Sequence, residues 1–416
     1  MRVNKKVGLE SGKNQKKLDF GSFSMKIDHM LDRILSKRLQ ASPKSVLLLG
    51  PRQVGKSTLM RSLHPMRIIN LMDESLYLSY MKDPARLHRE IAAITKPSLI
   101  AIDEIQRVPA LLNSIQVLLD EGCKHRFLLT GSSARKLKRG HANLLPGRIL
   151  IEHLAPLAYW ELGERFDLEK ALRIGTLPGV YLEAGETGEA LLESYGQIYL
   201  REEIQYEALT QNLGAYARFL DMAAEASGRW INYSKLASDS EIPKETLRRF
   251  YALLEDTLVV HRVQAFRPKV SKRRVSQRER FVFFDPGVRN ALLGIHRGHL
   301  SPMEKGNLFE QWIFLQLMAF NDINKKGWRI SSFRTDTGAE VDWILDTGSR
   351  LLAIECKSGK NVAEHDLNGL RVFDRFAHRQ AEKYVIYTGR SVQKFSKSET
   401  AIPYGDFLTS VLPSLK

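Results

Sequence analysis

A glycine-rich segment followed by a lysine and a hydroxyl residue has the clearest potential for chemistry in this sequence. It fits the pattern G-x-x-x-x-G-K-[ST], follows an apolar run at residues 46–49 and precedes an expected helix. The two glycines let backbone N–H groups point at phosphate oxygens, the lysine reaches the β- and γ-phosphates, and the serine hydroxyl is a Mg²⁺ ligand. A chance glycine-rich turn is the alternative, but the strand before it and the helix after it favour a phosphate-binding loop. The residues expected to bind the nucleotide are Gly50, Pro51, Arg52, Gln53, Val54, Gly55, Lys56, Ser57 and Thr58.

Two acids, Asp103 and Glu104, follow a second apolar run at residues 98–102. At the carboxyl end of a strand, Asp103 can hold Mg²⁺ through water. Glu104 is then placed to polarise the water that attacks the γ-phosphate. Acid pairs after strands also occur as helix caps. The phosphate-binding loop upstream favours the catalytic interpretation here.

Hydroxyl residues end the next expected strand, at residues 127–133. Thr130, Ser132 or Ser133 could hydrogen-bond the γ-phosphate or the attacking water, and we place Ser132 in the nucleotide site; the alternative is that a serine caps the next helix. Arg148, which follows Leu-Pro-Gly, could act as an arginine finger on the nucleotide of a neighbouring subunit. The alternative for Arg148 is an ordinary surface arginine.

Strands alternate with helices from residue 45 to residue 154, which predicts an open α/β sheet with helices on both faces. Ligands of such sheets bind beyond the carboxyl ends of the strands, where the loop and the acids fall. Residues 154–210 are expected to be mostly helical, with a turn at 175–181, and to form a lid or linker. Other expected elements are a strand at 67–71 and helices at 27–39, 85–94 and 108–120.

Residues 212–266 have a different character. The expected order is a helix, a short capped helix, a longer helix and a strand, at residues 212–227, 231–237, 243–256 and 257–266. Two helices around a short turn and then a strand form a winged helix-turn-helix pattern, in which Lys244, Arg248 and Arg249 share one helix face. The strongly basic residues 267–280 would be the wing or a loop along DNA. The alternative is a winged helix that packs against protein.

The last region carries a second group of residues suited to metal chemistry. We expect an apolar helix at residues 306–317, with one acid, Glu310, near its start. Two strands, at residues 340–345 and 351–357, are expected to pair as a hairpin. Asp342 on the first strand then approaches Glu355 and Lys357, which are two residues apart on the second strand and share one face. Carboxylates clustered beside a lysine can bind Mg²⁺ and activate water for phosphodiester cleavage. The alternative is a salt-bridged sheet.

Composition adds constraints on compartment and partners. The 416 residues include 63 Lys and Arg against 47 Asp and Glu, a formal charge of +16 that favours polyanionic partners, nucleic acid above all, over a charge that only keeps the surface soluble. The two cysteines, Cys123 and Cys356, form no disulfide framework and lack metal-site spacing. No apolar stretch is long enough to span a membrane and no signal peptide is visible, so we expect a cytoplasmic protein without a membrane partner.

Four segments, GPRQVGKST, IDEIQRV, LLTGSSARKL and LPGR, closely resemble the bacterial and archaeal AAA-type ATPases of the ATPase_2 kind. Members of that family carry a C-terminal domain of unknown function built from a winged helix and a restriction-endonuclease-like core. The resemblance covers the chain from about residue 25. It leads us to expect five parts. They are a basic flexible tail (1–24), a P-loop AAA-type ATPase core (25–165), a helical lid or linker (166–210), a winged helix (211–285) and a PD-(D/E)xK nuclease-like α/β domain (286–416).

The resemblance implies ATP and Mg²⁺ as cofactors, with the loop residues, Asp103 and Glu104 in the roles given above. It also implies a PD-(D/E)xK-like site, onto which Glu310, Asp342, Glu355 and Lys357 map. Here Glu310, Asp342 and Glu355 would be metal ligands, as Ser57 and Asp103 would be at the nucleotide.

Three functional classes follow from these features. The first is an ATP-hydrolysing AAA-type enzyme that acts on DNA with a metal-dependent nuclease module. The second is an ATP-dependent remodelling or branch-migration motor whose nuclease fold only grips DNA. The third is a nucleotide-regulated switch or defence protein. A homo-oligomer is expected in each case, and the intact acid and lysine set favours the first class over the second.

Overall fold

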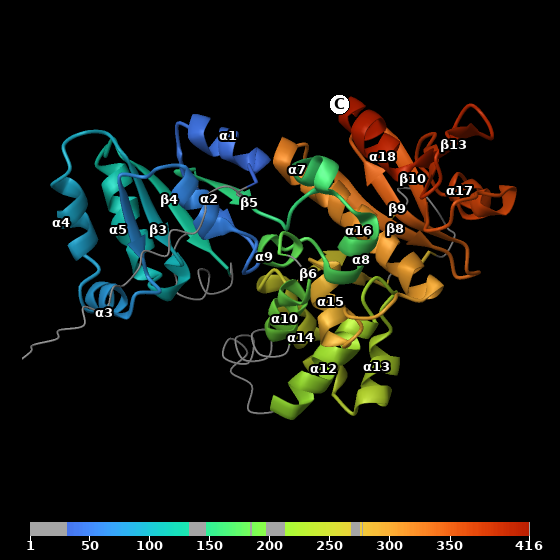
Figure 1. Cartoon of the computed structure of the whole chain (residues 1–416), viewed down its shortest axis with the longest axis horizontal. Helices are drawn as coiled ribbons and strands as arrows, with labels where there is room; N and C mark the ends of the chain where they lie inside the picture. The colour runs from blue at the N-terminus through green and yellow to red at the C-terminus, as the bar shows by residue number, and fades with distance from the viewer. Residues whose placement is uncertain are drawn as a thin grey trace, which may run out of the picture. The chain divides into compact units, whose positions relative to one another are not determined.

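The computed structural model describes residues 31–132, 147–183, 185–196, 213–267, 275–276 and 278–415 (Figure 1). The expected tail at residues 1–24 and most of the expected wing therefore lie outside the described residues. Ser133, a candidate at the nucleotide site, lies outside them too.

A five-stranded sheet forms the first part of the chain (Figure 1). All of its pairings are parallel, and the strand order is β2-β3-β4-β1-β5. The expected α/β sheet is confirmed, although the edge strand β5, only part of which is buried, matches none of the strands named from sequence. The strands are β1 (Ser45–Leu49), β2 (Arg67–Asn70), β3 (Leu99–Asp103), β4 (Arg126–Gly131) and β5 (Ile149–His153).

Helices cover both faces of this sheet because β1 is apolar on both sides. Val46 and Leu48 share a buried cluster with residues of α1 (Ile34–Ala41) and α2 (Lys56–Ser62), and Leu47 and Leu49 belong to a second cluster. That second cluster draws on α3 (Glu74–Lys82), α4 (Arg86–Ala92) and α5 (Ala110–Asp120).

Two helices of this region differ from the expectation. Helix α1 begins at Ile34, because Arg33 is extended and its side chain is bound elsewhere; residues 27–30 of the helix expected at 27–39 lie outside the described residues. Helix α3 was not expected; Asp73 caps it by accepting a hydrogen bond from the Leu76 N–H at 3.1 Å.

Short helices follow the sheet, and then a helix-turn-helix with a β-hairpin. The short helices are α7 (Tyr159–Leu162), α8 (Leu168–Ile174), α9 (Pro178–Tyr181) and α10 (Glu186–Ser194). The elements expected after residue 212 are present as α12 (Leu213–Glu225), α13 (Tyr233–Ser240), α14 (Lys244–Asp256) and β6 (Val260–Val263). Strand β6 pairs antiparallel with β7 (Arg280–Phe283).

Asp285 joins the short helices to the segment that follows the hairpin. It caps α15 (Pro286–Leu292) by accepting from the Val288 N–H at 3.1 Å, and it also accepts from the Thr176 N–H at 2.7 Å. The backbones approach so closely here that a Cβ on Gly287 would lie 2.0 Å from the carbonyl oxygen of Ile174. Helices α8 and α15 therefore form one packed unit.

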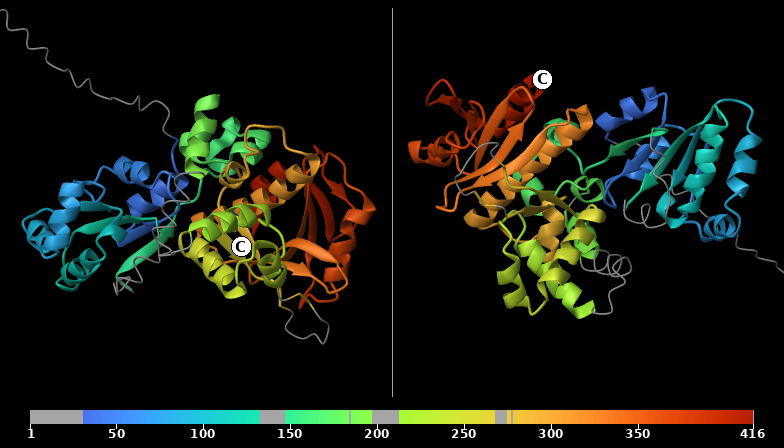
Figure 2. Two further views of the ribbon diagram at one scale, coloured as in Figure 1. Left: turned by 90° about the horizontal axis from the view of Figure 1, so that it is seen from below. Right: turned by 180° about the vertical axis from the view of Figure 1, so that it is seen from behind.

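A mixed six-stranded sheet forms the last part of the chain, in the order β12-β13-β11-β10-β9-β8, with the long helix α16 (Pro302–Asn324) packed on it (Figure 2). The expected hairpin is confirmed as the antiparallel pair β9–β10. The strands are β8 (Arg329–Arg334), β9 (Glu340–Asp346), β10 (Leu351–Lys357), β11 (Glu382–Tyr387), β12 (Gln393–Lys394) and β13 (Glu399–Pro403). The short helices are α17 (Asn368–Phe373), α18 (Tyr404–Asp406) and α19 (Leu412–Ser414).

None of the helices in the described part of the chain combines the length and apolar character needed to cross a membrane.

Asp285 should make stability depend on pH in a specific direction. Burial raises the pKa of Asp285 to about 6, although its backbone hydrogen bonds oppose the shift. The native state then binds a proton more tightly than the unfolded state, so ionisation above pH 6 costs stability and protonation restores it. When the pH falls from 7.5 to 5, we expect the free energy of unfolding of wild type to rise by on the order of 1 kcal/mol relative to that of Asp285→Asn. Urea unfolding at both pH values measures this, and an unchanged difference would contradict it.

Candidate functional site

The loop between β1 and α2 closes around its own lysine. Gly55 caps α2 at φ 93°, a conformation that favours glycine, and a Cβ on Gly50 would lie 2.3 Å from the carbonyl oxygen of Leu154. Lys56 Nζ donates to the carbonyl oxygens of Gly50 and Pro51, both at 2.8 Å. Burial lowers the pKa of Lys56 to about 8, and the nearby charges of Glu104 and Asp103 oppose that shift. The lysine and the two acids thus lie at one end of the sheet.

The two acids are joined to β4, which lies between β1 and β3. The hydroxyl of Thr130 donates to Asp103 Oδ1 and accepts from the Glu104 N–H at 3.0 Å. Gln106 donates from Nε2 to Glu104 and to Ser132 Oγ, the latter at 2.9 Å. The structure therefore brings Ser132 together with Glu104, while the role of Ser132 at the nucleotide stays a prediction. Gln106 was not singled out there; its position two residues after the acid was the only signal.

Glu104 has a left-handed backbone, with φ 58° and ψ 47°. This conformation is unusual for a residue with a side chain and costs about 1–3 kcal/mol, so the surrounding hydrogen bonds must hold it. Such outliers concentrate at functional sites, and this one lies at the candidate catalytic acid.

Arg33 supports the loop from behind, and nothing in the local sequence indicated it. Its Nη1 donates to the carbonyl oxygen of Val54 at 2.7 Å, and its Nε is 3.0 Å from Glu161 Oε1. A further hydrogen bond at 2.6 Å reaches the carbonyl oxygen of Ala155. The phosphate-binding loop is therefore tied to the segment that follows β5.

Arg148 lies away from the loop of its own chain. It directly precedes β5, at the amino ends of the parallel strands, while the loop follows their carboxyl ends. There it pairs with Asp120, with Nη2 3.1 Å from Oδ2. Within one chain Arg148 thus does not join Lys56 and Glu104.

The second predicted group does converge. Glu310 from α16, Asp342 from β9, and Glu355 and Lys357 from β10 line one cavity of about 550 Å³. Lys357 Nζ is 2.9 Å from Glu355 Oε1, and Asp342 Oδ2 accepts from the Cys356 N–H at 2.8 Å. A further carboxylate missed in the sequence, Asp366, also lines the cavity and is 3.6 Å from Lys357 Nζ.

Burial, followed by the charges of neighbouring groups, sets the pKa values in this cavity. Burial raises the pKa of Asp342 well above its ordinary value, and the charges of Glu310 and Glu355 raise it further. Burial also raises the pKa of Glu355, which Lys357 opposes. Although burial alone would lower the pKa of Lys357, the charge of Glu355 raises it, so the lysine stays protonated.

Arg280 corrects one expectation. Residues 267–280 are expected to form the wing or a loop along DNA, but the Arg280 side chain at the end of this segment is only 2% exposed and pairs with Glu310. It also donates to Ser332 Oγ at 3.1 Å and to the carbonyl oxygen of Asp342 at 3.3 Å, and it lies over the Trp343 ring. A buried guanidinium needs such acceptors, and they come from α16, from the C-terminal sheet and from the carbonyl oxygen of Gly228, all distant in sequence.

An all-oxygen donor set such as Glu310, Asp342 and Glu355 suits Mg²⁺. A cation there would also stabilise the ionised form of Asp342, whose pKa is raised by burial and by the charges of Glu310 and Glu355. Across the described ranges, however, no three His, Cys, Asp or Glu side chains are already spaced as metal ligands. Binding a metal here would therefore require the carboxylates to shift from Arg280 and Lys357.

The region of the first sheet matches a known protein family. Residues 42–163 match the family model described as an AAA domain. Residues 165–298 and 305–407 match two domains of unknown function, DUF8612 and DUF4143. The N-terminal part of the chain is thus an α/β, P-loop AAA-type ATPase domain, a class of protein that binds ATP and normally uses Mg²⁺. Neither of the other two descriptions names a nuclease or a winged helix.

Individual relatives add little about function. Over 380 residues the chain is 27% identical to Uncharacterized protein Rv2008c of Mycobacterium tuberculosis and to Uncharacterized protein Mb2031c of Mycobacterium bovis, covering 90% of this chain and 83% of each relative. A STAND protein from Pyrococcus horikoshii is 13% identical with a TM-score of 0.22, over 72% of this chain and about half (48%) of that one. AMPPCP-bound DnaA from Aquifex aeolicus is 11% identical with a TM-score of 0.23, over 53% and 84% of the chains. Likeness at these TM-scores establishes no shared function.

Arg280 and Glu310 should be energetically coupled. Arg280→Met leaves Glu310 without its partner in a buried place, which typically costs about 3–5 kcal/mol. Removing both charges in Arg280→Met/Glu310→Met should cost less than the sum of the two single changes. Urea unfolding of the four proteins measures the coupling, and strictly additive losses would show that the pair is not a unit.

Proposed function

We propose that this chain is an ATP-hydrolysing protein that acts on DNA and cleaves it at a metal-dependent site in its C-terminal region. The observation that carries the proposal is the meeting of Glu310, Asp342, Glu355 and Lys357, from three separate elements, in one open cavity. The AAA domain match supports the ATP-dependent part.

At the nucleotide, the backbone from Gly50 to Lys56 and the remaining loop residues would hold the phosphates, with Lys56 on the β- and γ-oxygens. Lys56 already donates to two carbonyl oxygens of the loop, so binding exchanges these for phosphate oxygens. Ser57 and Asp103 would hold Mg²⁺, which supplies charge neutralisation when bound. Glu104, held by Thr130 and Gln106, would orient and polarise the attacking water, with Ser132 beside it.

ATP binding and ATP hydrolysis should separate in two variants. Lys56→Ala should abolish binding, because it removes the cation from the β- and γ-phosphates. Glu104→Gln should bind normally but lose hydrolysis at least about 100-fold, since general-base catalysis is typically worth that much. Fluorescent-nucleotide binding and phosphate release measure the two effects. Equal hydrolysis by wild type and Glu104→Gln would rule out the catalytic role of Glu104.

At the second site, Asp342 and Glu355 would bind the metal directly and Glu310 through water. The metal supplies Lewis-acid activation of water and of the scissile phosphate when bound. Lys357, which stays protonated, would orient the nucleophilic water or stabilise the charge that develops on the phosphate oxygens. Release of Glu310 from Arg280 is part of this proposal.

The wider architecture is proposed on the same basis. Helices α13 and α14 with hairpin β6–β7 have the order of a winged helix, and α16 with β8–β11 that of a PD-(D/E)xK nuclease-like domain. We propose the domain limits 25–165, 166–210, 211–285 and 286–416 given above. We also propose that the protein forms a homo-oligomer in which Arg148 reaches the nucleotide bound by a neighbouring subunit. Its position far from its own loop agrees with action between subunits.

DNA cleavage should depend on the carboxylates and not on the nucleotide site. We expect Mg²⁺- or Mn²⁺-dependent nicking of a mixed panel of DNA structures that falls at least about 100-fold in Asp342→Ala and Lys357→Ala, because both groups act on the reacting phosphate. ATP hydrolysis should persist in both variants. Gel assays with each variant measure this, with His365→Ala at the exposed rim of the cavity as a matched control. Cleavage that survives Asp342→Ala would point to a contaminant.

A non-cleaving remodelling motor is the second candidate. One observation favours it: the carboxylates are paired with Arg280 and Lys357 and are not spaced as metal ligands within the described residues. Tight DNA binding and ATP hydrolysis without cleavage of any substrate would select it. ATP hydrolysis without DNA binding would instead select the nucleotide-regulated switch.

A further inference from the structure

We propose that a cleft between the helix-turn-helix and the C-terminal sheet binds a single strand of nucleic acid. The cleft has a volume of about 1310 Å³ and is separate from the carboxylate cavity. This inference rests on the proposed action on DNA and adds where the strand binds and in what form.

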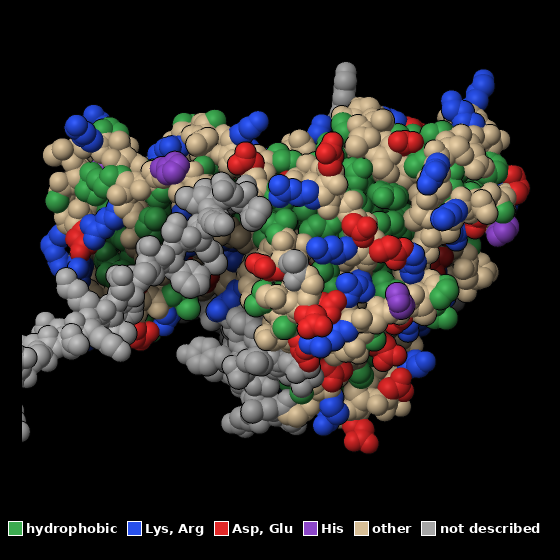
Figure 3. Space-filling view, viewed as in Figure 1, with side chains coloured by type: hydrophobic (Ala, Val, Ile, Leu, Met, Phe, Trp, Pro, Cys, Tyr) green, Lys and Arg blue, Asp and Glu red, His purple; other side chains and the backbone are tan. Residues whose placement is uncertain are grey.

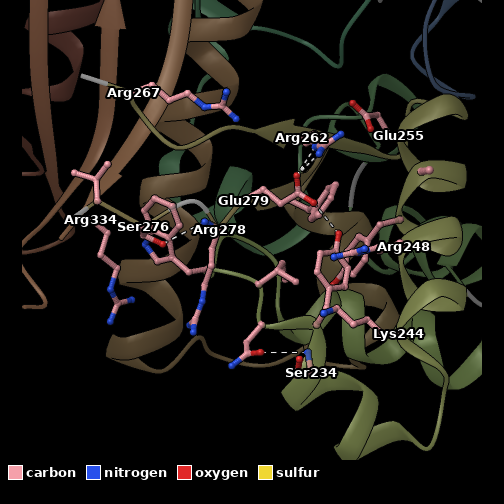
Figure 4. A pocket seen from close by; sticks show the side chains of 18 of the residues that line it. Ser234, Lys244, Arg248, Glu255, Arg262, Arg267, Ser276, Arg278, Glu279 and Arg334 are labelled. Atoms are coloured by element: carbon pink, nitrogen blue, oxygen red, sulfur yellow. Dashed lines mark hydrogen bonds and ion pairs between the residues drawn. The ribbon is translucent and has the colours of Figure 1, made fainter. Parts of the chain in front are cut away.

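Basic side chains line the cleft from both sides. In Figure 4, Lys244 and Arg248 extend from α14 on one side, and Arg278 and Arg334 come from the opposite side. The cleft is lined by six cations, which are Lys244, Arg248, Arg262, Arg267, Arg278 and Arg334, and by three acids.

Much of this positive charge is available to a ligand. Glu279 is already neutralised, because it accepts from Arg262 Nε at 2.5 Å and from the Tyr233 hydroxyl at 2.8 Å. Lys244, Arg267 and Arg278 have no ion pair with any residue in the described part of the chain. On the face drawn in Figure 3, by contrast, acidic side chains are interspersed with basic ones, which does not favour a polyanion there. Three of the six cations of the cleft can therefore meet phosphates without breaking an ion pair to a described residue, although Glu255 and Asp336 also line it.

Aromatic rings line the same cleft. Trp230 and Tyr233 are half-buried, and the Arg248 guanidinium lies 5.3 Å from the Tyr233 ring centroid. Tyr251 and Phe281, which stack with ring centroids 4.2 Å apart, support the cleft wall. Cations beside half-buried aromatic rings such as Trp230 and Tyr233 resemble the arrangement that binds single strands, whose bases can stack on aromatic rings. A duplex hides its base faces, so we assign the cleft to a single strand.

The cleft adjoins the carboxylate site through Glu340. This residue accepts a hydrogen bond from Trp230 Nε1 and is 3.6 Å from Arg334 Nη1, and both partners line the cleft. Its charge also raises the pKa of Glu310 and of Glu355, where burial is the larger cause. A strand held in the cleft would thus pass close to the proposed cleavage site.

The test measures binding alone, in EDTA and without ATP, by fluorescence anisotropy of a labelled oligothymidylate. A plot of log K against log salt has a negative slope. The triple variant Lys244→Ala/Arg267→Ala/Arg278→Ala should make this slope shallower by about 2, because each lost phosphate contact on a single strand contributes about 0.7. Tyr233→Leu should weaken binding about tenfold with little change in that slope. The control triple, Lys82→Ala/Lys96→Ala/Lys124→Ala, removes the same charge from exposed lysines of the AAA domain. It should leave the affinity and the salt slope unchanged.

Several results would overturn the inference. One is equal weakening by the two triple variants, which would mean diffuse attraction to the whole surface. Another is binding of a duplex of the same sequence as tightly as the single strand, with the same dependence on the cleft. Failure of wild type to bind any nucleic acid would instead refute the proposed action on DNA itself. Binding that is intact in both the cleft triple and Tyr233→Leu would refute only the cleft.

Discussion

Both candidate sites depend on buried cations that must find acceptors. Arg33 is withdrawn from water beside the phosphate-binding loop, and Glu161 and the carbonyl oxygen of Val54 satisfy it. Arg280 is withdrawn in the same way beside the carboxylates, where Glu310 and the carbonyl oxygen of Asp342 satisfy it. Because an unpaired buried charge costs several kcal/mol, each cation fixes the elements that carry its partners. Arg33 thereby holds the phosphate-binding loop to the segment after β5. Arg280 in the same way holds the β6–β7 hairpin to the C-terminal sheet.

What could be predicted from the sequence was local. The loop from Gly50 to Ser57 and the acid pair at Asp103 are encoded by short spacings between a strand and the residues that follow it. The hairpin that carries Asp342 and Glu355 was predictable for the same reason, since its two strands are joined by a short turn. In such cases the chain itself brings the side chains together, so sequence order and spatial order agree.

What could not be predicted depends on contacts across long stretches of chain. Arg280 lies at the end of a run of basic residues, and its burial follows from contacts with Glu310, Ser332 and the carbonyl oxygen of Asp342, which are distant in sequence. Arg33 and Asp366 likewise acquire their roles from partners that no spacing rule connects to them. The cleft is a further example, because its walls come from α14 and β8, which are distant in sequence. Charge composition indicated a polyanionic partner but could not place it.

The central claim is that one chain holds two separate metal-dependent, phosphate-handling sites. Anomalous diffraction from crystals grown with a non-hydrolysable ATP analogue and Mn²⁺ tests it most directly. The account predicts two peaks, one at the Ser57 hydroxyl beside the nucleotide phosphates and one between Asp342 and Glu355, with Glu310 released from Arg280. A nucleotide bound with manganese only at Ser57, and the Arg280–Glu310 pair intact at saturating metal, would contradict the cleavage site. A loop that binds no nucleotide would contradict the claim as a whole.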